Sequence, residues 1–292
     1  MKKTLIYILA GALMLCACDK SAPVSGDTSS KEISFNMSLS GTVTKVNQYG
    51  FQIGDQIGLW AVERTGGQKM PLQVGGNFIN NEPLTQTSSN HWQGSRPLYW
   101  SSVNCDFYGV FPYQAGITSV EEQPLSIALD QSVYNNFVGS DILWACAENV
   151  APGGVVNMQF RHMLSKLSVV IVEGENFEGT IPTDITVHIY NTSTSGKVNL
   201  CKGSVEKDSF APKGTITAYK VSDHRFETIV VPQFVEKKTP LIEVTMGGIA
   251  YLLEYSISLR PGYEHTIQLT LNTSPDQEMI EIGIDAETGG WN

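Results

Sequence analysis

The sequence predicts an all-β protein made of antiparallel sandwiches or barrels, and three observations lead to this fold class. Apolar and polar residues alternate with a period of two, as in Ile33, Phe35, Met37 and Leu39, which is typical of a strand with one buried face. Clusters of Gly, Pro, Asn and Asp separate these segments, as turns between short strands do. No stretch longer than about ten residues carries the period of an amphipathic helix.

The same pattern places strands along the whole body of the chain. We expect them at 33–39, 57–62, 105–111, 125–129, 155–160, 164–172, 185–189, 215–219, 227–231, 241–246, 249–259, 263–271 and 280–284. Residues 64–97 are polar and rich in glycine, which predicts long loops with at most one short strand at 77–79. The cluster Pro152-Gly153-Gly154 marks the most economical boundary, between an N-terminal domain at 31–153 and a C-terminal domain at 154–292.

Composition excludes two classes of protein. The 292 residues include 19 Lys and Arg against 29 Asp and Glu, and the formal net charge is −10. A protein that binds nucleic acid would need a basic face, which this balance does not supply. The hydrophobic content of 41% is enough for a packed core, so the chain is not intrinsically disordered.

The N-terminus reads as an export signal. Lys2 and Lys3 precede an apolar stretch at 5–15, which is too short to span a bilayer and typical of a secretory signal peptide at 1–17. The sequence Leu15-Cys16-Ala17-Cys18 resembles a bacterial lipobox, which implies that Cys18 becomes a lipid-modified N-terminus carrying acyl chains such as palmitate. Residues 18–30 then form a flexible tether rich in Ser, Pro, Gly and Asp. An ordinary signal peptide with a chance cysteine is the alternative.

Three cysteines remain in the body of the chain: Cys105, Cys146 and Cys201. An odd number excludes a fully paired disulfide framework. All three lie in apolar or strand-like contexts, so we expect buried free thiols, while one disulfide with one free thiol stays open.

Several short motifs follow one another in a distinctive order behind the lipobox. They are ISF at 33–35, TK at 44–45, FQIGDQIGLW at 51–60, FYGVFPY at 107–113, DILWA at 141–145, FRHMLSKL at 160–167 and LRPGY at 259–263. Each is weak alone, but the ordered set resembles the fimbrillin family of Bacteroidetes, the Mfa-like lipoprotein pilins. The resemblance extends from Met1 to Trp291.

The resemblance implies a structural subunit of a fimbria (pilus) that supports cell adhesion. Such proteins have two tandem antiparallel β-sandwich domains of the Greek-key, transthyretin-like kind. They are exported as lipoproteins to the cell outer membrane, where they are exposed on the surface. A trypsin-like protease then removes the N-terminal segment with its first strand, and an extended strand of a neighbouring subunit fills the groove in the fimbrium.

Carried over to this sequence, the removable first strand has Ile33, Phe35, Met37 and Leu39 as its apolar face. The basic residue for proteolytic maturation is Lys45. Members of the family often have Arg at this position, and a solvated turn lysine is the alternative interpretation of Lys45.

The candidate donor strand lies at 279–284. Its alternating apolar residues are Ile280, Ile282 and Ile284. A normal final strand of the C-terminal sandwich is the alternative interpretation of this segment.

The sequence offers no support for an enzyme. The five histidines lack zinc-binding spacings, and there is no nucleophile-elbow motif, so we expect no catalytic residues, no metal and no cofactor. His162 is expected to be a hydrogen-bonded structural residue.

Four tryptophans raise the question of ligand binding. Trp60 and Trp144 lie within apolar strands and are expected in the core, whereas Trp92 and Trp100 lie in the loop-rich region and are the candidate ligand aromatics. They support the alternative function, a surface lipoprotein that does not polymerise, or a tip adhesin, binding glycan or a host ligand. The expected partners are thus other fimbrial subunits, the outer membrane through the lipid, and a host or bacterial surface ligand, with no nucleic acid.

Overall fold

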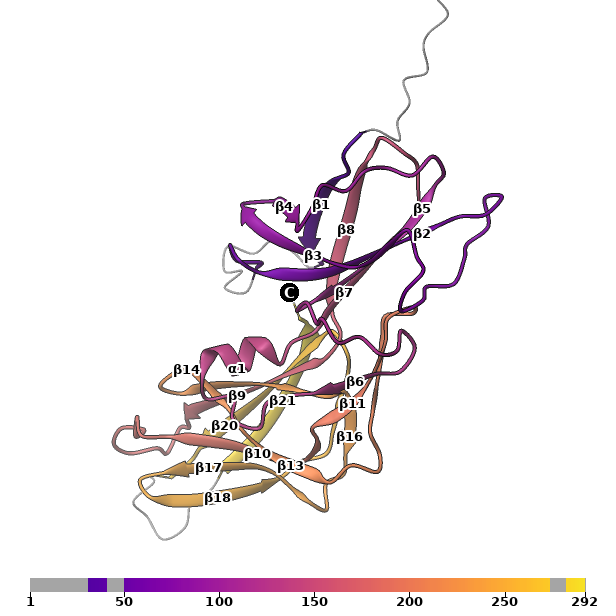
Figure 1. Cartoon of the computed structure of the whole chain (residues 1–292). Coiled ribbons are helices and arrows are strands. Elements are labelled where there is room, and N and C mark those ends of the chain that lie inside the picture. Colours follow the sequence, from indigo (N-terminus) through magenta and orange to yellow (C-terminus); the bar gives the residue numbers. More distant parts are fainter. Residues whose placement is uncertain (1–30, 41–49, 274–281, 292) are drawn as a thin grey trace, which may run out of the picture.

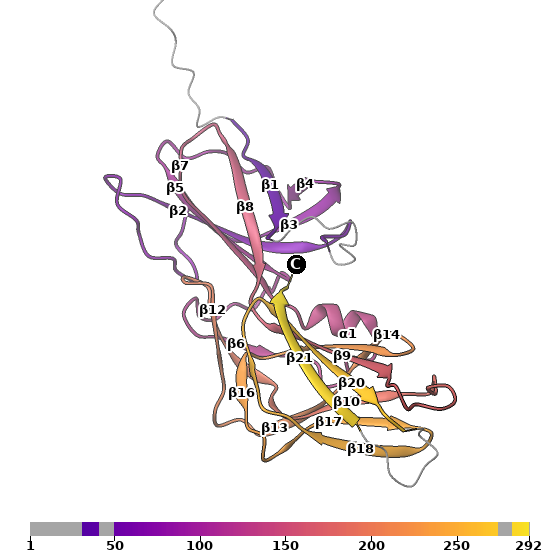
Figure 2. The same cartoon turned by 180° about the vertical axis from the view of Figure 1, so that it is seen from behind.

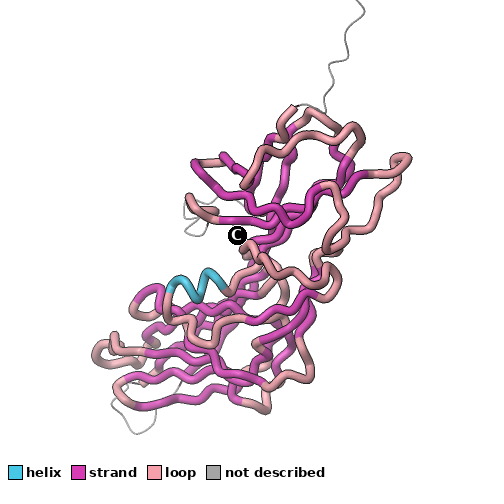
Figure 3. Tube along the Cα trace, viewed as in Figure 1, coloured by secondary structure: helices cyan, strands magenta, loops and turns pink. Residues whose placement is uncertain are grey.

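A computed structural model of the chain describes the fold of residues 31–40, 50–273 and 282–291. These residues form strands β1 to β21 and one short helix, α1 (Tyr134–Gly139). The predicted all-β, sandwich-like fold is confirmed. Figure 1 shows two lobes, and Figure 3 shows α1 at the junction between them.

The N-terminal lobe is built on one seven-stranded sheet in the order β1-β8-β7-β5-β2-β3-β4. Its strands are β1 (Ser34–Leu39), β2 (Gln56–Glu63), β3 (Ile79–Ser88), β4 (His91–Gly94), β5 (Cys105–Phe111), β7 (Leu143–Val150) and β8 (Val155–His162). The sheet curves until its two edges meet. The Ile33 N–H donates to the Leu98 carbonyl at 2.7 Å, and the Trp100 N–H donates to the Lys31 carbonyl at 3.1 Å.

The C-terminal lobe contains two larger sheets and two small ones. The four-stranded sheet has β13 (Lys213–Thr217), β10 (Thr186–Ser193), β17 (Pro240–Met246) and β18 (Ile249–Glu254). The five-stranded sheet has β14 (Tyr219–Ser222), β15 (Arg225–Val230), β9 (Ser165–Glu173), β20 (Tyr263–Leu271) and β21 (Ile282–Gly290). The small sheets join β6 (Gln123–Ser126), β11 (Ser195–Asn199) and β12 (Ser204–Lys207), and β16 (Gln233–Val235) with β19 (Ile257–Leu259).

Two cores stabilise this arrangement. The smaller core fills the curved N-terminal sheet, and the larger core lies in the C-terminal lobe. Trp60 and Tyr108 project from the opposite face of the N-terminal sheet and belong to the larger core. The two lobes are therefore joined by continuous apolar packing.

The structure corrects the antiparallel pairing at two places. β1 pairs with β8 in parallel, from Ser34 opposite Val155 to Leu39 opposite Phe160. β20 also pairs with β9 in parallel. Parallel partners need a long connection between them, and both pairs are far apart in the sequence.

The sheets do not divide at the expected boundary between 153 and 154. β7 and β8 flank this point and pair with each other in the N-terminal sheet, and Gly153 adopts a φ of 83° in the turn between them. Strands before β9 belong to the N-terminal sheet except β6, which pairs with β11 in the C-terminal lobe, and the strands from β9 onward belong to the C-terminal lobe. A Pro-Gly-Gly cluster serves a hairpin turn as readily as a linker, which explains the difference.

All three cysteines of the described body are free. Cys105 is fully buried, whereas Cys146 and Cys201 are only half-buried. Burial raises the pKa of the Cys105 and Cys146 thiols to about 11, so both are protonated at neutral pH.

Candidate functional site at the first and last strands

β1 closes the core of the N-terminal lobe. Ile33 and Met37 are buried, while Phe35 and Leu39 are half-buried against the same core. The intervening Ser34, Asn36 and Ser38 are exposed. Burial of one large aliphatic side chain contributes about 2 kcal/mol. Burial of this face therefore supplies a substantial share of the free energy that keeps β1 packed in the N-terminal lobe.

The surface on which β1 packs is formed mostly by β8 and β5. Val156, Met158 and Phe160 of β8 are buried beside it, and the Phe35 and Phe107 rings meet edge to face at 6.4 Å. Gly109 makes room for the large β8 side chains, because a Cβ there would lie 2.7 Å from Phe160. The surface on which β1 packs therefore consists of residues that are distant from β1 in sequence.

Polar contacts hold β1 on both sides. Next to β8, the Asn36 side chain donates to the Asn157 Oδ1 at 2.9 Å, and the Ser40 N–H donates to the Phe160 carbonyl at 2.6 Å. On the other side, Glu32 forms an antiparallel bridge with Tyr99. β1, together with the three residues before it, thus occupies a slot between β8 and the segment that follows β4.

β21 lies at the edge of the five-stranded sheet (Figure 2). It pairs with β20 along its whole length, from Ile282 opposite Leu271 to Gly290 opposite Tyr263. Ile282 and Ile284 are half-buried against the larger core, whereas residues 285–290 are exposed. Backbone pairing therefore carries most of the attachment of β21.

Trp291, directly after β21, anchors the end of the chain. Its ring stacks on the His162 ring with centroids 3.8 Å apart and an interplanar angle of 9°. The Trp291 N–H donates to the Gly262 carbonyl at 3.1 Å, and the Lys166 Nζ lies 5.6 Å from the ring centroid. Sequence reasoning missed this anchor, because nothing in the local pattern around Trp291 indicates a distant histidine.

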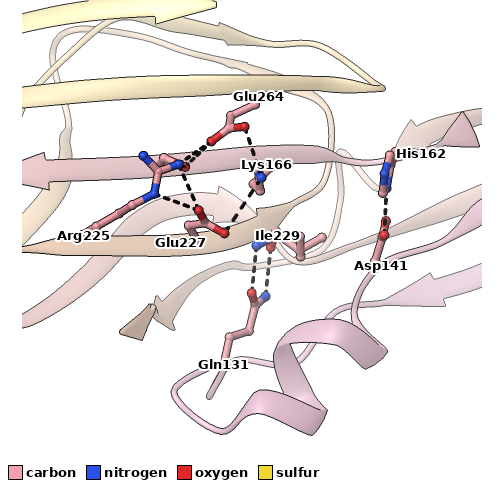
Figure 4. A network of polar contacts seen from close by, with 9 residues as sticks. Gln131, Asp141, His162, Lys166, Arg225, Glu227, Ile229 and Glu264 are labelled. Atoms are coloured by element: carbon pink, nitrogen blue, oxygen red, sulfur yellow. Dashed lines mark hydrogen bonds and ion pairs between the residues drawn. The ribbon is translucent and has the colours of Figure 1, made fainter. Parts of the chain in front are cut away.

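His162 is held by Asp141, as Figure 4 shows. The His162 Nδ1 lies 2.8 Å from the Asp141 Oδ2, and both residues are buried. This arrangement agrees with the expected structural role of His162. It orients the imidazole as a platform for Trp291.

A second histidine joins β20 to β21. The His265 Nε2 accepts a hydrogen bond from the Arg260 N–H at 2.9 Å, so in the neutral ring the proton is on Nδ1, which faces the Thr288 Oγ1 at 3.1 Å. Burial, together with the nearby Arg260 charge, lowers the pKa of His265. The neutral form therefore supports the pairing of β21.

Charged side chains form a network beside this anchor (Figure 4). The Lys166 Nζ lies 3.1 Å from the Glu264 Oε2 and 3.9 Å from the Glu227 Oε2, and Arg225 bonds both glutamates. Burial favours a higher pKa for Glu264, but Lys166, Ser168 and Arg225 outweigh it and hold that pKa below its usual value. The two cations thus neutralise the two carboxylates.

The expected exposure of Trp92 and Trp100 is wrong. Trp92 is 7% exposed and Trp100 is 2% exposed. Trp92 packs on Phe51, and Trp100 packs on Phe107, because the polar region around them forms strands that fold these rings into the core. Neither ring has the exposure that the sequence predicts for a ligand-binding aromatic.

The other predicted tryptophans and site residues are placed as follows. Trp60 is buried as expected, and Trp144 is half-buried with its Nε1 donating to the Leu200 carbonyl at 2.8 Å. Cys18, Lys45 and Ile280 lie outside the described residues.

Within residues 31–40, 50–273 and 282–291, no three His, Cys, Asp or Glu side chains gather to hold a metal ion. No helix in the same ranges has the length and apolar character needed to cross a membrane.

Fold and site together define a class: a two-lobed β-sandwich protein whose first strand completes the core of its N-terminal lobe. A sequence model of the family described as Fimbrillin-like matches residues 44–291. The chain therefore belongs to the fimbrillin-like family. The matched range begins after β1.

Solved structures show the same fold. The chain is similar to a candidate cell adhesion protein from Bacteroides ovatus, with a TM-score of 0.70, 16% identity, and coverage of 89% of this chain and 97% of that one. A candidate cell adhesion protein from Bacteroides uniformis is similar with a TM-score of 0.67 and 18% identity, over 90% of this chain and 98% of that one. A fimbrial protein from Bacteroides vulgatus is similar with a TM-score of 0.53 and 12% identity, over 89% of this chain and 99% of that one. No curated protein sequence matches the chain.

Proposed function

We propose that this chain is a structural subunit of a surface fimbria that assembles by exchange of β-strands between neighbouring subunits. In this mechanism, proteolysis after Lys45 releases the segment that carries β1. An extended strand of a neighbouring subunit then takes its place. The slot that β1 fills, bounded by β8 on one side and by the bridge at Tyr99 on the other, carries the proposal, and membership of the fimbrillin-like family supports it.

The slot is suited to a foreign strand because β1 makes its contacts with distant parts of the chain. β8 keeps its partner β7 when β1 is absent, so the remaining sheet retains its pairing. Loss of β1 would leave a row of free backbone N–H and C=O groups beside apolar pockets. An incoming strand satisfies the backbone groups and fills the pockets with alternate side chains.

We propose the segment 279–284 as the donor. Ile280, Ile282 and Ile284 are spaced by two, as are the apolar residues of β1. Since β21 pairs with β20 in the free subunit, donation requires that β21 leave β20. The anchored Trp291 would oppose this release.

Limited digestion of the mature chain with trypsin tests the exchange. We expect a new N-terminus at Val46, read by mass spectrometry, together with multimers that resist SDS. The matched variant Lys45→Gln should keep its N-terminus and stay monomeric. A cleaved chain that remains monomeric would contradict the proposal.

A second variant separates the donor assignment from the exchange itself. Ile282→Asp should shorten the multimer ladder, because a carboxylate cannot enter an apolar pocket without a large cost, whereas the exposed Glu287→Asp should leave it unchanged. If Ile282→Asp polymerises like the unaltered chain, another segment is the donor and the exchange still stands.

Export as a surface lipoprotein completes the proposal. A diacylglycerol on Cys18 would anchor the protein in the outer membrane before maturation. The variant Cys18→Ser should lose both the lipid mass and sedimentation with membranes. An unaltered membrane fraction for this variant would exclude Cys18 as the anchor.

A further inference from the structure

Phe210 projects from the loop between β12 and β13. It is 100% exposed, more than any other large hydrophobic residue in the described part of the chain. The loop beneath it is held in place, because the Asp208 Oδ1 accepts hydrogen bonds from the Phe210 N–H at 2.9 Å and the Ala211 N–H at 3.2 Å. The Asp208 N–H donates in turn to the Ser195 carbonyl at 3.0 Å. The loop therefore presents a phenyl ring to the solvent on a fixed base.

A cavity of about 270 Å³ at the junction of the two lobes is large enough for such a ring. Its apolar wall includes Phe51, Phe111, Phe137, Leu143, Ile229 and Trp291. A cavity of about 150 Å³ lined by apolar side chains holds benzene, so this one accommodates a phenyl ring with its methylene stem. The exposed Gln52 and Asn135 are part of the lining, which means that the cavity opens to solvent.

The charged groups in the cavity wall already have partners in their own chain. The Asp55 Oδ2 accepts the Gln52 N–H at 2.7 Å, and the Asp141 Oδ2 lies 2.8 Å from the His162 Nδ1. Lys166 pairs with its two neighbouring glutamates. An incoming group therefore gains free energy mainly from the burial of apolar surface, which favours an apolar side chain.

Exposed apolar side chains from both lobes lie around the mouth of the cavity. Ile53 follows Gln52 in the loop at 50–55 of the N-terminal lobe, and it is exposed. Val133, directly before α1, and Tyr134, which lines the cavity, are exposed on the C-terminal lobe. Exposed apolar groups around an apolar cavity are typical of a surface that binds another protein.

The ring and the cavity lie too far apart to meet within one chain. The loop that carries Phe210 is bonded to Ser195 of β11, and Figure 1 shows β11 and α1 on opposite sides of the C-terminal lobe. Figure 2 shows the same separation between β12 and α1. A contact between the ring and the cavity therefore joins two copies of the chain. Because it pairs two different surfaces, it repeats from copy to copy without closing on itself.

The distribution of charge supports a second copy as the partner. Lys207 and Lys213 lie three residues to either side of Phe210, and both are exposed. Near the cavity, Asp55 is half-buried in the wall, and Asp130 is exposed beside α1. The two surfaces thus carry opposite charges, which opposes the repulsion expected between two chains with a net charge of −10 each.

We propose that Phe210 of one copy inserts into the lobe-junction cavity of a second copy. The ring packs among Phe51, Phe137 and Trp291, and the flanking lysines face the carboxylates near the mouth. The contact uses neither the slot of β1 nor the release of β21, so it forms between uncleaved chains and brings subunits together before strand exchange. It consists of side-chain packing that SDS disrupts, which distinguishes it from multimers joined by exchanged strands.

Sedimentation velocity of the mature Lys45→Gln chain, in native buffer, tests the contact without cleavage at that site. We expect the sedimentation coefficient to rise with protein concentration. Phe210→Ser changes a fully exposed residue, so it keeps the fold, and should weaken self-association at least tenfold. The control Leu252→Ser removes an exposed apolar side chain from β18 and should leave self-association unchanged. A chain that stays monomeric up to about 1 mM, or equal losses in the two variants, would overturn the proposal.

A pair of complementary variants tests the head-to-tail direction. Asn135→Trp adds a large side chain at an exposed position of the cavity lining, so it blocks the cavity and leaves Phe210 free. Phe210→Ser and Asn135→Trp should each be monomeric alone, whereas their mixture should form a complex of two chains and grow no further. One chain then supplies the only open cavity and the other the only ring. A mixture that stays monomeric or grows beyond two chains, or an Asn135→Trp chain that associates like the unaltered one, would overturn the proposal.

Discussion

The first and last strands are attached in different ways, although each lies at the end of a sheet order. β1 and the residues directly before it place Met37 and Ile33 in a core and fill a slot with neighbours on two sides. β21 is an edge strand with mostly exposed side chains, held by β20 and by the ring that follows it. β1 is therefore held by side-chain burial, whereas β21 is held by backbone pairing and by the anchor at Trp291.

The largest effect is expected when a charge enters the β1 face. Met37→Asp should destabilise the N-terminal lobe by about 4 kcal/mol, because a carboxylate would be buried among apolar side chains without a partner. Urea unfolding measures the change, and the exposed neighbour Ser38→Asp is the control. Equal losses for the two variants would show that β1 does not depend on burial.

A smaller and more local effect is expected at the other end. Trp291→Ala should cost about 3 kcal/mol and raise hydrogen exchange in β21 more than in β1, because it removes the stacked ring from His162. Exchange measured by mass spectrometry would resolve the two strands. A uniform rise over the whole chain would mean that Trp291 stabilises the lobes together and not β21 alone.

The smallest effect concerns pH and also separates the two strands. The pKa of His265 is lowered by burial and by Arg260, so the unfolded chain takes up the proton at higher pH than the folded one. Its contribution is present above the unfolded value of about 6.5 and is lost as pH falls through the lower folded value.

Urea midpoints between pH 7.5 and 5, taken for the unaltered chain and for His265→Gln, measure this contribution. We expect a steeper decline for the unaltered chain, with β21 exchanging first. If the two declines are parallel, another group is responsible for the pH dependence.

Alternating apolar residues predict a strand correctly where the buried positions of that strand are also hydrophobic. β8 and β20 alternate cleanly and were predicted close to their true bounds. β3 was missed because two of its buried positions are Glu82 and Gln86, and Pro83 interrupts the pattern. The Glu82 carboxylate is satisfied by the Ser95 N–H and hydroxyl, which a period-two pattern cannot reveal.

The functional features differ in the same way, because some follow from local sequence and others only from the tertiary fold. The apolar face of β1 follows from local alternation, so the sequence was sufficient to predict it. The cavity and the Trp291 anchor combine residues near 50, 140, 162 and 291, which only the tertiary fold brings together. Long-range assembly of this kind leaves no local signal.

The parallel pairing of β1 and β8 also fixes an orientation. Because both strands begin at the same end, Lys31 lies beside the β7–β8 turn, where its Nζ donates to the Gly153 carbonyl at 2.9 Å. Figure 1 shows this end of β1 remote from the C-terminal lobe. A support attached upstream of Lys31 would therefore join the molecule at the end of the N-terminal lobe that is remote from β18 and the C-terminal lobe.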